Sequence, residues 1–92
     1  MNPDSTIALG DARVGFRGRI HAIDPTRGGG GLTPAELERR LLELGFVEGA
    51  DVEVLHEGLF GGDPIAVRVA ATTIALRRRE AMAVLVGSRG SE

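Results

Sequence analysis

The residues of this sequence that best suit chemistry gather around one predicted turn. His56 and Glu57 close an alternating segment, and Asp63 follows beyond two glycine-flanked apolar residues. An imidazole and two carboxylates are ligands that suit a divalent transition metal. His21 is the only other imidazole, and no HxxH, HxxE or thiolate pattern supports a site. We therefore interpret the three as a histidine at the rim of the fold beside hydrated carboxylates, so that no cofactor is expected, with weak binding of a divalent metal ion as the alternative.

Residues for covalent or acid–base catalysis are scarce. A catalytic serine needs a neighbouring base, but the serines lie close to the two ends of the chain and both histidines are isolated. Four consecutive glycines at residues 28–31 could suggest a phosphate-binding loop. The Gly-Lys-Ser/Thr ending of such a loop is absent, because the chain contains no lysine. We predict no catalytic residues, and we interpret the glycines as a linker.

Composition limits the class of protein. Ninety-two residues make one domain, with residues 1–6 and 87–92 predicted to be flexible ends and residues 7–86 to be folded. The absence of cysteine suits a cytoplasmic location, and no apolar run is long enough to span a bilayer. A net charge of -2 argues against direct binding of nucleic acid. We therefore expect a cytoplasmic protein without membrane insertion.

The most clearly marked element is a helix at residues 34–44. Thr33 is suited to cap it, Pro34 to occupy its first position, and Glu36 to complete a capping box. Three leucines then recur on one face, and a glycine and a phenylalanine follow where a helix end places them, namely Leu37, Leu41, Leu44, Gly45 and Phe46. A helix this short is not stable alone in water, so the leucine face must pack on something else.

Alternating segments predict strands before and after this helix. Residues 16–24 precede it, and the segments that follow begin at Val52, Ile65, Ile74 and Met82. In the second strand we expect Val52, Val54 and His56 to face inward, and we expect residues 58–64 to form a loop. The predicted fold is mainly β, a small barrel of about five strands, with one α-helix inserted after the first long strand.

Leu59 and Phe60 interrupt this predicted loop with two apolar side chains between glycines. Two interpretations are open. Exposed apolar residues of this kind can mark a contact with a partner protein. Alternatively, the two side chains fold over one end of the barrel as a plug for the core.

Several runs of the chain resemble the ferrous iron transport protein A (FeoA-like) domain family. They are ERRLLELGFVEG at residues 38–49, VEV at 52–54, GGDPI at 61–65, and ALRR at 75–78 followed by Glu80 and Ala81. The resemblance implies an SH3-like barrel. It also implies a small cytoplasmic accessory of bacterial ferrous iron uptake, which binds and modulates a membrane iron permease that carries a GTP-binding domain.

The resemblance also shapes the expected contact surface. We expect Leu59 and Phe60, together with Leu42, Arg39 and Arg40 on the outer side of the helix, to contact the permease or a second copy of this chain. The resemblance also implies that the same barrel occurs at the C-terminus of iron- and manganese-dependent repressors. The alternative function is therefore a metal-responsive regulatory or sensor module that binds a divalent metal ion, Fe²⁺ or Mn²⁺, or a transcriptional regulator.

Overall fold

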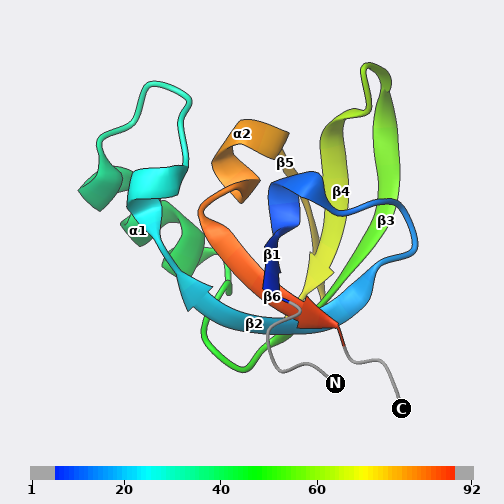
Figure 1. Cartoon of the computed structure of the whole chain (residues 1–92), viewed down its shortest axis with the longest axis horizontal. Coiled ribbons are helices and arrows are strands. Elements are labelled where there is room, and N and C mark those ends of the chain that lie inside the picture. Colours follow the sequence, from blue (N-terminus) through cyan, green and yellow to red (C-terminus); the bar gives the residue numbers. More distant parts are fainter. Residues whose placement is uncertain (1–5, 89–92) are drawn as a thin grey trace.

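A curved antiparallel sheet forms most of the molecule (Figure 1). The computed structural model describes residues 6–88, and in that range six strands pair in the order β1-β6-β2-β3-β4-β5. The strands are β1 (Thr6–Ala8), β2 (Arg17–Ile23), β3 (Asp51–Phe60), β4 (Asp63–Val69), β5 (Thr72–Leu76) and β6 (Val84–Ser88). The helices are α1 (Pro34–Glu43) and α2 (Arg78–Ala81), with 3-10 turns η1 (Leu9–Asp11) and η2 (Pro25–Arg27).

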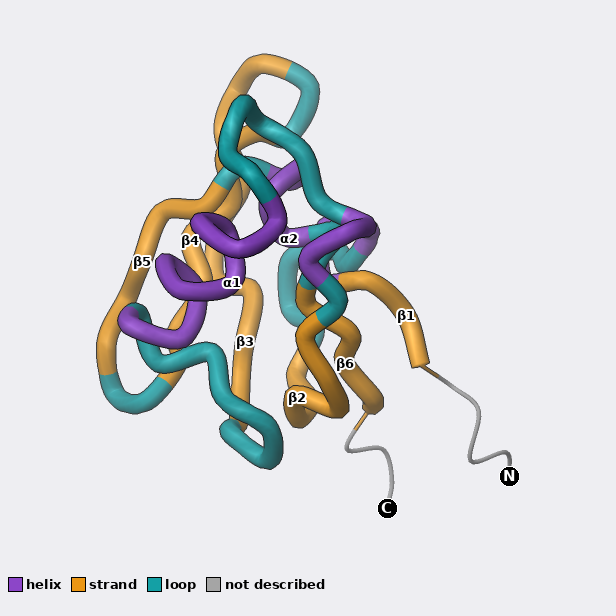
Figure 2. Tube along the Cα trace, turned by 90° about the vertical axis from the view of Figure 1, so that its left-hand side faces the viewer, coloured by secondary structure: helices purple, strands orange, loops and turns teal. Residues whose placement is uncertain are grey.

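The fold is mainly β as predicted, but its sheet does not close into a barrel. Its edge strands β1 and β5 are not paired with each other, and β1 is a sixth strand that the apolar alternation does not predict. It forms because Ile7 pairs with Val86 of β6. Figure 2 shows both helices between the two edges, and α2 packs against η1 and β4. The helices therefore fill the side where the sheet is open.

The start of α1 follows the predicted cap. The Thr33 hydroxyl oxygen accepts a hydrogen bond from the backbone N–H of Glu36 at 3.2 Å. In return, the Glu36 carboxylate accepts one from the backbone N–H of Thr33 at 2.9 Å. Pro34 occupies the first helical position. The capping box thus satisfies two backbone donors that the first turn leaves free.

The end of α1 directs the chain back into the core. Gly45 has a φ of 104°, and the Phe46 backbone N–H donates to the Leu41 carbonyl at 3.0 Å. The left-handed glycine and the hydrogen bond from Phe46 back to Leu41 form a Schellman motif at the helix C-terminus. Leu37, Leu41 and Phe46 are buried, while Leu44 is partly buried against the same cluster. The leucine-faced helix is therefore packed as its spacing predicts.

The core lies between the concave face of the sheet and the helices. Most of its members are aliphatic side chains that alternate along the strands, joined by residues of η1 and α1 and by Phe46 after the helix. No polar or charged side chain is buried within residues 6–88. The largest fully buried residues are Phe46, Leu9, Ile20, Leu37, Leu41, Ile65, Leu76, Val54, Val67, Val69, Val84 and Val86.

The segment predicted as a loop at residues 58–64 is instead most of a hairpin. Strand β3 continues to Phe60 and β4 begins at Asp63, so only Gly61 and Gly62 connect them. Their φ values of 69° and 77° suit a two-residue hairpin turn, in which both central residues are left-handed. Glycine marked the turn correctly, but the strands reach further than their apolar alternation suggested.

The inward orientation predicted for His56 is wrong. A register shift in β3 follows Val54, so Val54 pairs with Val67 and His56 pairs with Ala66. Because successive side chains of β4 point to opposite faces, this bulge places His56 on the outer side of the sheet, where it is exposed. The next residue, Glu57, pairs with the buried Ile65 and so points to the opposite side.

The ends of the folded region differ slightly from the prediction. Thr6 belongs to β1, and Gly87 and Ser88 belong to β6, so the predicted flexible ends are wrong for these three residues. The rest of those predicted ends, residues 1–5 and 89–92, lies outside the described residues. Among the residues described, no helix has the length and apolar character needed to cross a membrane.

Candidate protein-binding site at the β3–β4 hairpin

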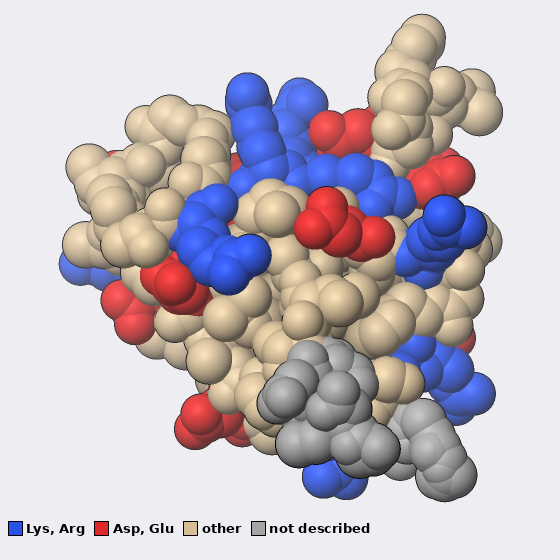
Figure 3. Space-filling model, in the orientation of Figure 1, with Lys and Arg blue, Asp and Glu red and all other residues tan. Residues whose placement is uncertain are grey.

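The tip of the β3–β4 hairpin, residues 58–62, carries two fully solvated apolar side chains. Leu59 is 94% exposed and Phe60 is 89% exposed. Other large apolar residues with notable exposure are at most 47% exposed. The hairpin projects beyond the body of the molecule in Figure 1, and its tip carries no charged side chain in Figure 3. Neither side chain covers the core, so the plug interpretation does not describe this structure.

Glycines give the tip its shape. A Cβ atom at Gly58 would collide with the carbonyl oxygen of Asp63 on the opposite strand. The two strands can therefore approach here only because Gly58 has no side chain. Gly61 and Gly62 supply the left-handed turn described above. The glycines thus form a narrow hairpin end that presents Leu59 and Phe60 to solvent.

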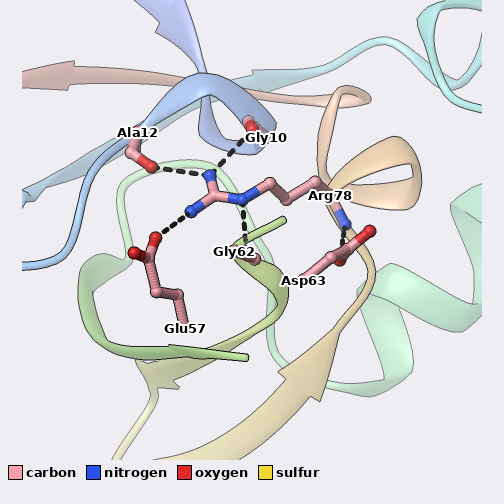
Figure 4. A network of polar contacts seen from close by, with 6 residues as sticks. All are labelled: Gly10, Ala12, Glu57, Gly62, Asp63 and Arg78. Carbon is pink, nitrogen blue, oxygen red and sulfur yellow. Dashed lines mark hydrogen bonds and ion pairs between the residues drawn. The ribbon is translucent and has the colours of Figure 1, made fainter. Parts of the chain in front are cut away.

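A single arginine joins the hairpin to the rest of the fold (Figure 4). Arg78, the first residue of α2, donates from Nε to the Gly62 carbonyl at 2.7 Å and from Nη2 to the Glu57 carboxylate at 2.8 Å. Its backbone N–H donates to the Asp63 carboxylate at 2.9 Å. Both strands of the hairpin are therefore bound to one residue.

The same guanidinium also binds the opposite side of the opening in the sheet. Arg78 Nη1 donates to the carbonyls of Gly10 at 3.0 Å and Ala12 at 2.8 Å. These two carbonyls belong to η1 and the residue after it, next to edge strand β1. The Arg78 side chain is only 22% exposed, so these charge-assisted bonds are partly shielded from water. Arg78 therefore ties the hairpin to η1 across the open side of the sheet.

The predicted metal ligands do not form a site in this geometry. His56 and Glu57 point to opposite sides of β3, and the Glu57 and Asp63 carboxylates accept hydrogen bonds from Arg78. His21 is elsewhere, on β2 beside Gly87 of β6. Within residues 6–88, no group of three or more histidine, cysteine or acidic residues could hold a metal ion. The predicted ligands therefore do not fit a resident metal in this arrangement.

The structure also separates the two halves of the predicted contact surface. Arg39, Arg40 and Leu42 are exposed on α1, and Leu42 is 44% exposed. In Figure 1, α1 and the hairpin tip lie at opposite sides of the molecule. The helix residues and the tip therefore do not form one continuous patch, and the tip is the more exposed of the two.

The outer face of the sheet carries ion pairs of ordinary surface type. Arg19 binds Asp51 and Arg68 binds Glu53, each at 3.3 Å, and three of these four side chains are more than half exposed. A cavity of about 510 Å³ next to them is lined in part by the same charged residues. Pairs this exposed contribute little to stability. Charges of both signs also mix on the side of the molecule that Figure 3 shows, unlike the uniform basic surface of a nucleic-acid binder.

Only an indirect signal in the sequence points to Arg78. It lies in a run of three arginines, and all three are typical of a solvated helical turn. Its backbone acceptors in Gly10, Ala12 and Gly62 carry no side-chain pattern that a sequence could display.

Comparison with known proteins identifies the fold family. The model of the FeoA domain matches residues 7–87. The chain belongs to the FeoA domain family. This family is associated with ferrous iron transport and is an accessory domain of transport, not a known class of enzyme. No curated protein matches the chain by sequence.

Solved structures of FeoA proteins agree with this assignment. The solution structure of FeoA from Chlorobium tepidum is 29% identical with a TM-score of 0.72, covering 94% of this chain and 73% of that protein. FeoA from Stenotrophomonas maltophilia, an SH3 domain protein crystallised with zinc, is 32% identical with a TM-score of 0.68. That match covers 85% of this chain and 86% of the relative. The predicted SH3-like fold is therefore confirmed, with an open sheet in place of a closed barrel.

A manganese-dependent transcriptional repressor shares the same fold. It is 24% identical to this FeoA domain, with a TM-score of 0.72. The match covers 96% of this chain but only 44% of the repressor. This likeness therefore concerns the fold of one part of that protein.

Proposed function

We propose that this FeoA domain is a cytoplasmic accessory protein of bacterial ferrous iron uptake. In this proposal it binds the cytoplasmic part of a membrane iron permease that carries a GTP-binding domain, and so modulates transport. Membership of the FeoA family supports the link to iron transport. The observation that carries the proposed contact is the exposure of Leu59 and Phe60 at the end of a projecting hairpin.

The energetics favour the tip as the main contact. Burying a leucine or phenylalanine side chain contributes about 1.5 to 3 kcal/mol each. Leu59 and Phe60 are almost entirely exposed, so nearly all of this free energy is still available for association. A pair of apolar anchors of this kind is typical of an interface hot spot. We infer that the permease offers an apolar cleft for the two side chains.

A double substitution at the tip tests this proposal. Leu59→Ser with Phe60→Ser should lower the affinity for the purified cytoplasmic region of the permease by at least a factor of ~100, because the burial free energy of both apolar side chains is lost from the interface. Biolayer interferometry with the immobilised permease region would measure the change. Thermal unfolding followed by circular dichroism should show the same midpoint as the parent protein, since neither side chain is buried.

Leu42→Ser on α1 is the matched control. Leu42 is 44% exposed, but it lies on the other side of the molecule from the tip. We expect this variant to keep the affinity of the parent protein. Equal losses in the control and in the tip variant would argue against a contact at the tip, and an unchanged affinity in the tip variant would refute it.

A metal-responsive module is the second candidate, because the S. maltophilia relative was crystallised with zinc. The residues of this chain support it poorly, since Glu57 and Asp63 are bound by Arg78 and His56 faces away from Glu57. Anaerobic calorimetric titration with ferrous or manganous ion would test it. Binding tighter than about 10 µM that is lost in His56→Ala would favour the sensor over the accessory role.

A further inference from the structure

The tip of the hairpin has few internal restraints. Regular cross-strand pairing ends at Glu57 and Ile65, and beyond a register shift the next pair is Phe60 with Asp63. Gly58, Gly61 and Gly62 make up most of the remaining backbone, and glycine restricts backbone rotation least. A hairpin end built in this way would be free to change its direction if nothing else held it.

Arg78 supplies the missing restraint from outside the hairpin. It contacts β3 through Glu57, the turn through the Gly62 carbonyl, and β4 through the Asp63 carboxylate. These contacts are to the residues just before and just after the tip and to Gly62 within it (Figure 4). The same guanidinium also donates to the Gly10 and Ala12 carbonyls, so it fixes the direction of the tip relative to the body of the fold.

The geometry requires an arginine in particular. Nε, Nη1 and Nη2 all donate, in three different directions, to four acceptors. A planar guanidinium presents such a fork of donors, whereas the ammonium group of lysine is a single point and can reach only some of these acceptors. Lysine at residue 78 would therefore keep the positive charge but lose the simultaneous hold on the hairpin and η1.

We propose that Arg78 is the positioning residue of the partner-binding tip, which holds Leu59 and Phe60 in the direction required to enter the partner. This inference rests on the proposed function, because it assigns the role of Arg78 within that same contact. Holding the tip in advance removes an ordering cost that association would otherwise include. Loss of the hold should weaken binding about tenfold, equivalent to about 1.4 kcal/mol, although Arg78 itself need not touch the partner.

The first test uses the free protein and needs no partner. In the parent protein, backbone order parameters from ¹⁵N relaxation should be as high for residues 58–62 as for β2 and β6, about 0.85. In Arg78→Lys we expect the order parameters of the tip amides to fall below ~0.6, while those of β2 and β6 stay unchanged. Arg79→Lys is the matched control, since Arg79 is the exposed neighbour on α2, and it should change neither.

The second test is a double-mutant cycle on the affinity for the permease region, measured by calorimetry. Arg78→Lys should weaken binding about tenfold in the parent protein but no more than about twofold in the Phe60→Ala background. Such coupling is expected only if Arg78 acts through the tip. A merely structural role would lower the affinity by the same factor in both backgrounds.

The outcomes separate this inference from the proposed function. If the parent protein does not bind the permease region, the proposed function fails. If it binds but the order of the tip is unchanged in Arg78→Lys, or if order is lost equally in every strand, the positioning role is refuted. Should Arg78→Lys fail to fold, Glu57→Gln removes the charge from one acceptor only. It should loosen the tip in the same direction to a smaller extent, and an unchanged tip there would also refute the role.

Discussion

Two neighbouring leucines of α1 provide a direct test of how the helix is packed. Leu41 is 0% exposed in the core, whereas Leu42 is 44% exposed on the outer side of the same helix. We predict that Leu41→Ala destabilises the protein strongly and that Leu42→Ala does not. Both substitutions remove the same atoms from the same element, so differences in helix propensity and in chemistry cancel.

The expected magnitudes follow from burial. Truncating a fully buried leucine costs about 2 to 5 kcal/mol, because transfer free energy is lost and a cavity remains. At roughly 4 to 8 °C per kcal/mol for a domain of this size, a loss of about 3 kcal/mol lowers the unfolding midpoint by about 12 to 24 °C. At the exposed leucine the loss should stay below about 1 kcal/mol, partly offset by the higher helix propensity of alanine.

Urea unfolding followed by circular dichroism at 222 nm would measure both variants, since the chain has no tryptophan or tyrosine for fluorescence. Leu41→Met, which keeps most of the volume, should cost less than about 1.5 kcal/mol and serves if the alanine variant is unfolded without denaturant. Equal destabilisation by the two alanine variants, or a larger effect of Leu42→Ala, would refute the packing of α1 described here.

Three further positions test the backbone features of the fold by the same unfolding measurement. Thr33→Ala should cost about 1 kcal/mol because it removes half of the capping box, and Thr33→Ser should restore most of that loss. Gly45→Ala should cost about 1 to 2 kcal/mol, since an alanine at a φ of 104° is strained and its Cβ would lie 3.2 Å from that of Ala70. Gly58→Ala should cost about 1 to 3 kcal/mol through the collision with the Asp63 carbonyl. A stability within about 0.5 kcal/mol of the parent, the usual scale of neutral surface changes, in any of the three alanine variants would contradict the local structure.

Local signals were sufficient to predict α1 from the sequence. Its cap, its leucine spacing and its terminal glycine all act within one or two turns, so each can be recognised from neighbouring residues. The structure confirms them, including the Phe46 N–H bond to the Leu41 carbonyl. Elements whose structure is determined by residues close in sequence can therefore be predicted from the sequence alone.

The hairpin shows where that reasoning fails. Residues 58–64 contain three glycines and a proline, which are typical of a loop, yet most of them are in paired strands. The bulge after Val54 depends on the register with β4, and apolar alternation within β3 alone does not reveal it. The same bulge turned His56 outward and separated it from Glu57, so the predicted group of ligands did not form.

The candidate site was predicted only in part. The sequence singled out Leu59 and Phe60, but it could not decide between a plug and a contact, because that depends on where the hairpin points. Arg78 binds carbonyls of Gly10 and Ala12, more than 60 positions away along the chain. Contacts between a side chain and distant backbone atoms leave no pattern in a single sequence, so this residue could be found only in the structure.

The most direct test of the account is a chemical-shift titration of the ¹⁵N-labelled protein with the cytoplasmic region of the permease. We predict that the amides perturbed most are those of residues 57–63 together with Arg78, while the amides of α1 change little. Perturbations centred on Arg39, Arg40 and Leu42, or spread over the outer face of the sheet without the hairpin, would contradict the assignment of the tip as the contact surface.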